Sequence, residues 1–524
     1  MYSCPGCGSM MTFDIQGQQL KCGRCDRTES IAEADAREAR YAGSSFSVDL
    51  LTCPTCGAAI RTMNTASAAF CSYCGASVML QQQTDEMEAP STIAPFRITR
   101  EACFEKYRQM LKRSLCVDHR LKKDVRPESF RGIYVPYHIY SGMVTGDASL
   151  EGHMTRGNDT YYYNTVVSLN HQYDDILHDA SLEMPDTLSE RISRVPADAF
   201  RPFSPAYISG FYADIPDTQP DAYLSFAKAT AVRTGLKEVI DDLDDGCSYS
   251  TGEAEKKLTK LAHARHTGET LVPVWFMSIR SGRRVLYAIQ NGVTGEMAAD
   301  VPLDIPRFAL VTLLAAVPLF FLFNAFLTLR PEMVMVLAML LAVLAQLVVN
   351  GRRKALKDRE AADQASEALQ DTEEMRLQLR RRKQLERSAK GSGLSGALQS
   401  IGGIGGAALT AAAMYGLSRV DDIRIFHLLA LGLTAVMFFL VPAFRKDKTR
   451  APFGSIAALL AMIAGCVILI LNPFRSADLP VYLVSFLCMA AVIWESVDLL
   501  LLHNRECSNP LPQFESHQGG EDHA

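Results

Sequence analysis

Eight cysteines near the start of the chain form two quartets with the same internal spacing. Each quartet reads C-x2-C-x14-C-x2-C, and the second repeats the first 49 residues later. Their members are Cys4, Cys7, Cys22, Cys25 and Cys53, Cys56, Cys71, Cys74. Two close pairs of thiolates can complete the tetrahedral coordination of one metal ion. The spacing therefore predicts two structural Zn²⁺ sites, one in each quartet.

Each cysteine pair lies in a short knuckle, as in Cys4-Pro5-Gly6-Cys7-Gly8. Proline restricts the turn, and glycine lets backbone N–H groups turn toward the thiolates. Such a module is too small for a core of its own, so the metal supplies most of its folding free energy. That contribution is about 10–16 kcal/mol in small zinc peptides. Four thiolates leave no open coordination position, which argues against catalysis at the metal.

Two other interpretations of the quartets stay open. The cysteines could hold iron as in rubredoxin or act as redox pairs, or Cys4 and Cys7 could coordinate one ion together with Cys53 and Cys56. We prefer two closed zinc sites because the quartets repeat as complete units. The segment MYSCPGCG lacks the features of a secretory signal, so we expect the thiols to lie in the cytosol, where CxxC pairs favour metal.

The charge of the two ribbons bears on what they bind. Residues 1–30 carry three basic and three acidic side chains, and residues 51–82 carry a single charged residue, Arg61. Surfaces that bind nucleic acid normally display clustered lysine and arginine. We therefore predict protein partners, with nucleic acid disfavoured and a membrane-tethered nucleic-acid regulator as the alternative function.

The rest of the chain changes in composition several times, which predicts a multidomain protein. Tandem Cys4 ribbons precede an α+β domain and an all-α polytopic membrane region. The predicted segments are zinc ribbon 1 (1–30), a helical linker (31–50), zinc ribbon 2 (51–82), a polar linker (83–94), an α+β cytosolic domain (95–306), a transmembrane hairpin (307–349), a charged cytosolic helix (350–392), four further transmembrane helices (393–503) and a cytosolic tail (504–524).

The α+β domain carries no recognisable reaction centre. It has no P-loop, no GxGxxG after a strand, no HExxH and no GxSxG, so we predict that the protein is not an enzyme. His263 and His266 could share a helix face, but without nearby cysteine or carboxylate partners a metal site there is disfavoured. The run Tyr161 to Tyr163 fits the face of a β-sheet better than a ligand-stacking site.

A basic stretch follows the first helix of this domain. It comprises Lys112, Arg113, Arg120, Lys122, Lys123 and Arg126. Basic residues near a membrane can contact anionic lipid headgroups. A solvated helix face is the simpler interpretation of the same residues.

Several phrases in the middle of the chain resemble a family of bacterial membrane-anchored zinc-ribbon proteins, often labelled transcription-factor-type zinc ribbon or primosomal helicase-like. The resemblance spans roughly residues 50 to 330. It rests on the CPxCG knuckles, Pro95-Phe96-Arg97-Ile98-Thr99, Gly132-Ile133-Tyr134-Val135-Pro136-Tyr137, Leu271-Val272-Pro273-Val274-Trp275 and Asn291-Gly292-Val293-Thr294-Gly295. It implies a ribbon and soluble domain anchored in a membrane. The doubled ribbon and the large membrane region depart from the family, and no nucleotide-binding motif supports a helicase.

Six apolar runs follow residue 307. They are Phe308–Leu329, Met333–Val349, Leu394–Leu417, Ile425–Phe444, Phe453–Leu471 and Val481–Leu502. Leu394–Leu417 is rich in glycine and alanine, and charge counting decides that it spans. If this run spans the membrane, the basic clusters after residues 350 and 445 and the C-terminal tail all lie on the cytoplasmic side. We predict a multi-pass protein of the bacterial inner membrane with both termini cytoplasmic.

Glu495 and Asp498 are acids within the last apolar run. Carboxylates inside a membrane often have a functional role. These two lie near one end of the run, which favours a position at the membrane–water interface. We therefore expect a non-enzymatic membrane protein that binds or organises protein partners, and a small-solute transporter is the less favoured alternative. The sequence names no small-molecule ligand, and it leaves a homo-oligomer open.

Overall fold

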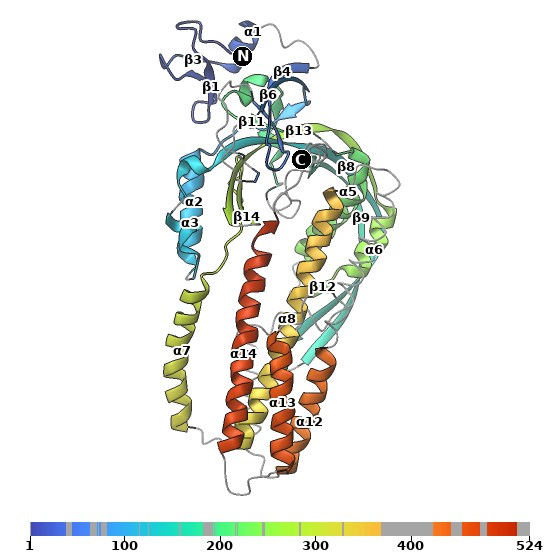
Figure 1. Ribbon diagram of the computed structural model, residues 1–524. Coiled ribbons are helices and arrows are strands. Elements are labelled where there is room, and N and C mark those ends of the chain that lie inside the picture. Colours follow the sequence, from blue (N-terminus) through green and yellow to red (C-terminus); the bar gives the residue numbers. More distant parts are fainter. Residues whose placement is uncertain are drawn as a thin grey trace, which may run out of the picture.

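The structure is a computed structural model, and it describes the ribbons, the middle domain and most of the apolar helices. The described residues are 2–37, 45–62, 71, 73–74, 81–114, 116–123, 125–156, 159–181, 192, 194–214, 216, 218–243, 247–281, 284–326, 330–367, 423–441, 453–471 and 479–510. The ribbons lie at one end, a curved sheet follows them, and a group of long helices forms the other end (Figure 1). We call residues 2–304 the head.

Ribbon 1 is a small antiparallel sheet followed by a short helix. Its strands are β1 (Met11–Asp14), β2 (Gln19–Cys22) and β3 (Thr28–Glu29), in the order β1-β2-β3. The helix α1 (Ile31–Arg37) starts at a capping box in which Ser30 and Glu33 accept hydrogen bonds from each other's backbone N–H groups. The helix predicted from residue 31 is therefore present, and its expected continuation past residue 37 lies outside the described residues.

Among the described residues, 13 strands form one large sheet that curves into a half-barrel (Figure 1). Its longest members are β8 (Arg131–Arg156), β9 (Asp159–Asp179), β13 (His263–Ser281) and β14 (Arg284–Asn291), all paired antiparallel. β-branched and aromatic residues, as in Gly132–Tyr140 of β8 and Val272–Ile279 of β13, favour these strands.

Ribbon 2 is part of this sheet rather than a separate module. Its strands β4 (Ser45–Thr52) and β5 (Ala59–Thr62) pair with each other, and β5 pairs with β11 (Tyr212–Ala213), which lies parallel to β8. The predicted boundary between ribbon 2 and the α+β domain is therefore crossed by sheet hydrogen bonds.

The segment predicted as a polar linker, 83–94, is mostly strand. β6 (Gln81–Glu88) pairs with β4, and β7 (Thr92–Ile93) pairs with β13. The order of strands ends at β6, so this polar segment forms an edge of the sheet. Polar and charged side chains suit an edge strand, which explains why composition alone indicated a linker. The predicted helical linker 31–50 likewise ends in the strand β4.

Four helices in the described part of the head pack on its sheet. α2 (Arg100–Arg113) is capped by Thr99, whose side chain accepts a hydrogen bond from Ala102 N–H, and α3 (His119–Lys123) follows it. α5 (Leu224–Leu243) and α6 (Gly252–Leu261) share a core with residues of β8 and β9, including Tyr140 and Leu150. Helices packed on a sheet agree with the predicted α+β class of this domain.

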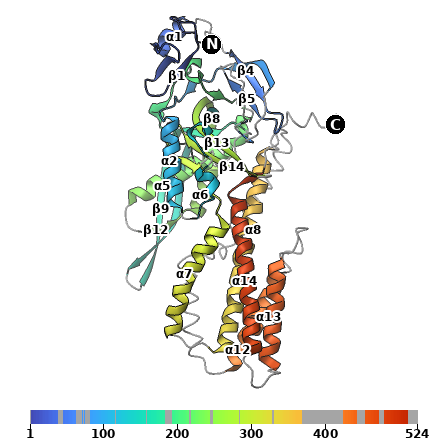
Figure 2. The same cartoon turned by 60° about the vertical axis from the view of Figure 1, so that its left-hand side comes forward.

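The helical end contains five long helices in the described part of the chain. They are α7 (Ile305–Phe326), α8 (Pro331–Glu367), α12 (Ile423–Leu440), α13 (Phe453–Leu471) and α14 (Leu479–Glu506). α8, α12, α13 and α14 pack together around a shared apolar core, whereas α7 stands apart from them in two views (Figures 1 and 2).

Three of these helices are long and apolar enough to cross a membrane, within the residues described: Pro331–Lys354, Gly454–Leu471 and Leu479–Glu506. Ile305–Pro318 and Arg424–Leu440 are shorter apolar helices, and the predicted span Leu394–Leu417 lies outside the described residues. Many of their large side chains are exposed, such as Leu428 and Phe439. That surface is consistent with a membrane protein.

α8 does not end where the first predicted membrane hairpin ends. It continues through residue 350 to Glu367, so the apolar run and the start of the charged segment are one helix. Gly351 lies at the change of polarity but does not end the helix, and residues 352–367 contain neither glycine nor proline. The remainder of the segment predicted for 350–392 lies beyond the described residues.

α14 joins the helical end to the head. After it, β16 (Asn509–Pro510) pairs with β14, although residues from 504 onward were predicted to form a tail. Asn504 accepts a hydrogen bond from Leu303 N–H at 2.7 Å and donates one to the Leu303 carbonyl at 2.8 Å. The C-terminal end of α14 is thereby fixed beside the start of α7.

Candidate metal centres

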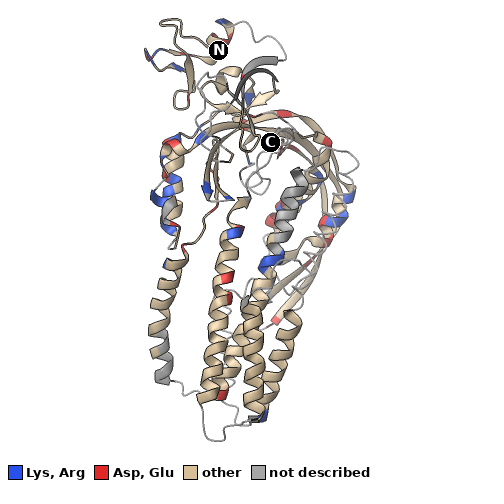
Figure 3. Ribbon diagram, in the orientation of Figure 1, with Lys and Arg blue, Asp and Glu red and all other residues tan. Residues whose placement is uncertain are grey.

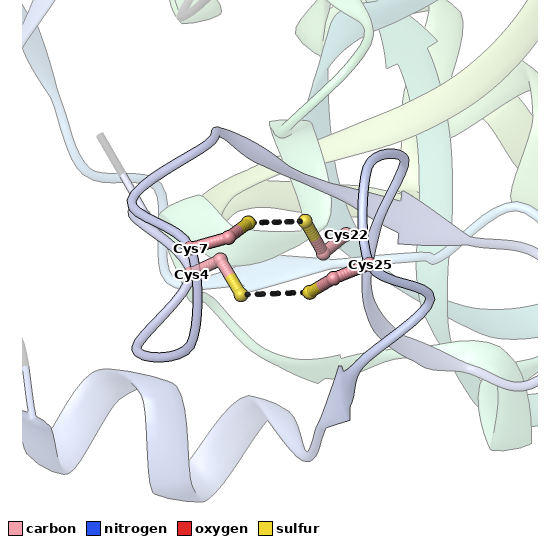
Figure 4. Close-up of side chains that lie close together, drawn as sticks. All are labelled: Cys4, Cys7, Cys22 and Cys25. Carbon is pink, nitrogen blue, oxygen red and sulfur yellow. Dashed lines mark hydrogen bonds between the residues drawn. The ribbon is translucent and has the colours of Figure 1, made fainter.

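The first quartet is gathered at one side of ribbon 1. The knuckle before β1 supplies Cys4 and Cys7, and the end of β2 with the turn after it supplies Cys22 and Cys25. The Sγ atoms of Cys4 and Cys25 are 3.5 Å apart and those of Cys7 and Cys22 are 3.4 Å apart (Figure 4). These cysteines are free thiols. Four sulfurs at about 2.3 Å from a tetrahedral ion would be separated by about 3.8 Å, close to the observed spacing.

Backbone N–H groups approach the thiols of Cys4 and Cys7. Gly6 N–H donates to Cys4 Sγ at 3.4 Å and lowers the pKa of that thiol. The backbone N–H of Ser9 is the main reason that the pKa of Cys7 is lowered to about 6. A lowered pKa favours the thiolate, which is the form that binds metal. Gly8 has φ +72°, a conformation that glycine adopts without strain and that the knuckle requires.

The second quartet repeats this arrangement in a more buried place. Cys53, Cys56, Cys71 and Cys74 are all buried, with Sγ distances of 3.8 Å for Cys53–Cys74 and 3.8 Å for Cys56–Cys71. The knuckles that begin the two quartets also have the same backbone hydrogen bond. Cys4 N donates to Ser9 O at 2.8 Å as Cys53 N donates to Ala58 O at 2.9 Å. The sequence repeat of 49 residues is thus a structural repeat.

Each quartet forms its own cluster, so the cross-braced pairing of Cys4 and Cys7 with Cys53 and Cys56 does not occur. In both clusters the four ligand atoms lie within 4.8 Å of one another. Two tetra-cysteine sites that could bind structural metal ions are therefore present, and they fit zinc-ribbon-like motifs. With all four ligands supplied by the protein, neither cluster leaves an open position for a substrate.

The metal clusters differ in their surroundings. The buried thiols of ribbon 2 share a core with Tyr137 and Phe276 of the half-barrel. Ribbon 1 packs through Tyr2, Met11 and Phe13 on another part of the head, and its Cys25 is exposed. Ribbon 1 is held to the head by hydrogen bonds from Phe13 N to Ser209 O at 2.8 Å and from Gln18 Nε2 to Phe96 O at 2.7 Å.

The prediction for His263 and His266 was wrong in its secondary structure. Both lie on β13 rather than on a helix, and they pair with Met143 and Tyr140 of β8. Side chains three positions apart on a regular strand point to opposite faces, so the two histidines do not form a pair. His266 instead comes together with His138 and Glu269, which lie within 4.8 Å of one another by their potential ligand atoms.

His138 was missed because it lies 128 residues before His266 in the chain, whereas Glu269, three residues after His266, was a nearby carboxylate that sequence analysis overlooked. They become neighbours through the register of two strands, in which His138 of β8 is directly opposite Glu269 of β13. A strand pattern covers Gly132–Tyr140, which includes His138, but the second one, Val272–Ile279, begins after Glu269, and no local pattern indicates how the two strands pair.

Other residues singled out by the sequence lie apart from these clusters. Tyr161, Tyr162 and Tyr163 are on β9 as expected, with their side chains exposed, Tyr162 at 83 %. The basic stretch covers the end of α2, α3 and the turn after it, next to the start of α7 (Figure 3). Asp118 N–H donates to Pro302 O at 3.2 Å, which ties this stretch to the segment before α7.

Glu495 and Asp498 have different environments on α14. Asp498 forms an ion pair with Arg353 of α8 at 3.9 Å. Glu495 is only 2 % exposed, and neither carboxylate oxygen has a hydrogen-bond partner within the described part of the chain. A Cβ on Gly454 of α13 would lie 3.4 Å from Glu495 Cγ, so Glu495 is packed between helices rather than at an open interface.

Comparison with known proteins adds one relative. Over 320 residues the chain is 24 % identical to "Uncharacterized protein YdjG" of Bacillus subtilis (strain 168). The aligned region covers 58 % of this chain and 90 % of that protein. No family model matches the chain, and no solved structure matches it. The similarity thus extends over nearly all of the relative but attaches no activity to the sites described above.

Proposed function

We propose that this protein is a non-enzymatic membrane protein whose head binds or organises protein partners at the membrane. The proposal rests on the direct packing of both ribbons against the half-barrel. β5 of ribbon 2 pairs with β11 of the main sheet, and ribbon 1 shares an apolar core with Phe96, Tyr134 and Trp275. The ribbons therefore present a fixed, metal-dependent surface above the helices (Figure 1).

We infer that the metal in both ribbons is zinc. The donor set supports this inference, since four thiolates in a closed tetrahedron are typical of structural zinc. Iron would accept the same sulfur ligands, and metal analysis of the purified chain distinguishes the two.

Charge supports protein partners over nucleic acid. The basic side chains of ribbon 1 are offset by acids, as in the ion pairs Lys21–Asp26 at 3.1 Å and Arg37–Glu29 at 2.9 Å. A surface that binds a phosphate backbone would instead leave several basic groups together and accessible.

The membrane assignment rests on the apolar helices and on the charges at their head-side ends. Arg307 lies in the first turn of α7, Arg352 and Arg353 follow the apolar part of α8, and Arg505 lies in the last turn of α14. The basic residues of α2 and α3 lie near the same level (Figure 3). Basic residues concentrate on the cytoplasmic side of membrane proteins and attract anionic lipid. We therefore assign the head to the cytoplasmic side of a bacterial inner membrane.

Photocrosslinking in intact membranes tests the docking role. A photoreactive amino acid at exposed Arg24 of ribbon 1 is expected to give discrete protein adducts, whereas the same residue at exposed Lys257 of α6 gives none. The adducts should disappear when Cys4 and Cys7 are replaced by serine, because the ribbon surface then loses its metal. Adducts to nucleic acid, or equal adducts at both positions, would contradict the proposal.

A labelling control in the same cells tests on which side of the membrane the head lies. A Lys257→Cys variant should react with a membrane-impermeant maleimide only after the cells are permeabilised, relative to the unmodified chain. Reaction in intact cells would mean that the head faces outward and that the observed adducts are not cytoplasmic.

Transport is the second candidate function, and buried Glu495 is the observation that favours it. Acidic side chains in membrane helices often mark ion paths. If the helices only anchor the head, proton flux into proteoliposomes should be at background, and Glu495→Gln should not change it. Asp498→Asn is the matched control on the same helix. A flux that Glu495→Gln abolishes and Asp498→Asn retains would replace the anchor function with transport.

A further inference from the structure

One group of polar side chains on the half-barrel has no role in the proposed docking function. His138, His266 and Glu269 lie on a single face where β8 and β13 pair. His138 is opposite Glu269, and His266 is opposite Tyr140, two residues from His138. Directly opposite residues and residues two apart on a strand share a face of the sheet.

An irregularity in β13 makes this grouping possible. The register of β13 on β8 shifts between His266 and Gly268, so that Thr267 is an extra residue. In a regular strand, positions 266 and 269 would point to opposite faces. The extra residue returns both side chains to one face, and bulges of this kind commonly redirect side chains beside functional sites.

The hydrogen bonds of His138 define which nitrogen is available. Its Nε2 lies 3.1 Å from the Thr218 carbonyl oxygen and 3.1 Å from Thr218 Oγ1. We assign the ring proton to Nε2, which donates to the carbonyl, so Nδ1 carries a lone pair. Metal-binding histidines characteristically donate their second N–H to a carbonyl or carboxylate in this way.

The Nδ1 atom of His138 is buried close to other hydrogen-bond acceptors. His138 is 0 % exposed, and its Nδ1 has no hydrogen-bond partner among the described residues. Nδ1 lies 3.5 Å from Glu269 Oε1, and His266 Nε2 is also buried without a hydrogen-bond partner in the described chain. A nitrogen lone pair and a carboxylate oxygen repel each other unless a proton or a cation lies between them.

A direct hydrogen bond does not account for the arrangement, because the 3.5 Å between His138 Nδ1 and Glu269 Oε1 is long for one and Nδ1 has no hydrogen-bond partner among the described residues. The spacing fits a cation instead. Nitrogen and oxygen ligands at about 2.0–2.1 Å from a tetrahedral ion are about 3.3–3.4 Å apart, close to the 3.5 Å observed.

We propose that His138, His266 and Glu269 form a third metal site, which binds an exchangeable divalent transition-metal ion through two imidazole nitrogens and one carboxylate. The site differs from the ribbons in having three protein ligands rather than four. Glu269 is 36 % exposed, so the remaining coordination position is open to water or to another donor. An ion here would join β8 and β13 and, through His138, the loop that carries Thr218.

Calorimetric titration of Zn²⁺ into the full chain, with both ribbons already loaded, tests the proposal. We expect one further equivalent to bind. Glu269→Gln and His266→Gln should each weaken that binding at least about 100-fold, since loss of an outer partner alone commonly costs 10- to 100-fold. Cobalt at the third site should show a spectrum of nitrogen and oxygen ligands without the sulfur charge-transfer bands of the ribbons.

His263→Gln is the matched control, because His263 is on the same strand but outside the cluster. It should bind the further equivalent like the unmodified chain. Metal retained in the ribbons of every variant shows that the head is folded. The proposal is overturned if no further equivalent binds, or if it binds equally in the Glu269→Gln, His266→Gln and His263→Gln proteins.

Discussion

Replacement of Cys53 and Cys56 by serine is expected to remove one structural metal ion and to unfold much of the head. The thiols of ribbon 2 are buried in the core that also contains Val135, Tyr137 and Phe276 of the half-barrel. Loss of two ligands would leave the remaining thiols and two new hydroxyls buried without metal. Metal binding contributes about 10–16 kcal/mol to small zinc modules, which matches the whole stability of a typical domain, about 5–15 kcal/mol.

The matching change in ribbon 1 should have a smaller effect on the half-barrel. Cys4→Ser with Cys7→Ser also removes one metal ion, but Cys25 of that quartet is exposed and ribbon 1 forms a separate three-stranded sheet. Metal content by mass spectrometry and thermal unfolding of the detergent-solubilised chain measure both effects. A double replacement of Cys247 and Cys507, which are outside the quartets, should retain all bound metal. Full metal content in the Cys53, Cys56 variant would refute the ligand assignment.

Trp275→Ala is expected to cost about 3–5 kcal/mol of folding free energy, the usual range for removing a buried tryptophan from a core. Trp275 is 1 % exposed on β13. Its ring centroid lies 4.8 Å from that of Phe96 and 6.1 Å from that of Phe211, and its Nε1–H donates to Ile98 O at 2.8 Å. The substitution therefore creates a cavity and leaves the half-buried Ile98 carbonyl without its donor.

The effect of Trp275→Ala should extend to ribbon 1, because the backbone of Phe96 holds Gln18 of that ribbon. Urea unfolding followed by circular dichroism gives the loss of stability, and the metal content of ribbon 1 reports the extension. Trp494→Phe is the control, since Trp494 is 54 % exposed on α14 and its replacement should change the midpoint little. Equal shifts for Trp275→Ala and Trp494→Phe would show that the aromatic cluster does not stabilise the head.

The tight packing around Trp275 also explains one glycine. Gly132 of β8 is opposite Trp275, and a Cβ there would lie 2.4 Å from Cδ1 of Phe211. Only a residue without a side chain allows Phe211 to reach the cluster. The phrase that begins at Gly132 was among the residues that carried the family resemblance, and its first member thus has a packing role.

The parts of the protein that local sequence predicted well are those in which neighbours in the chain are neighbours in space. The Cys4 and Cys7 knuckle and the helix that starts at residue 31 each depend on a few consecutive residues. Turn chemistry and helix propensity act over that range, so the local sequence indicated both. Long apolar runs similarly predicted the helices α8, α13 and α14.

Segments with weak local signals were predicted less well. The polar strand β6 forms because β4 offers it an edge, and its own composition resembled a linker. α8 continues past residue 350 because a change from apolar to charged side chains alters its surroundings without breaking its backbone hydrogen bonds.

The sequence by itself determined the ligands, the repeat and the closed coordination of the two quartets, because each site needs only two knuckles joined by a short hairpin. Only the tertiary structure joined the ribbons to the half-barrel, and only it brought His138 to His266 and Glu269. Those contacts depend on the register of strands more than a hundred residues apart and on a bulge at Thr267. Register is set by the packing of the whole sheet, which no local pattern encodes.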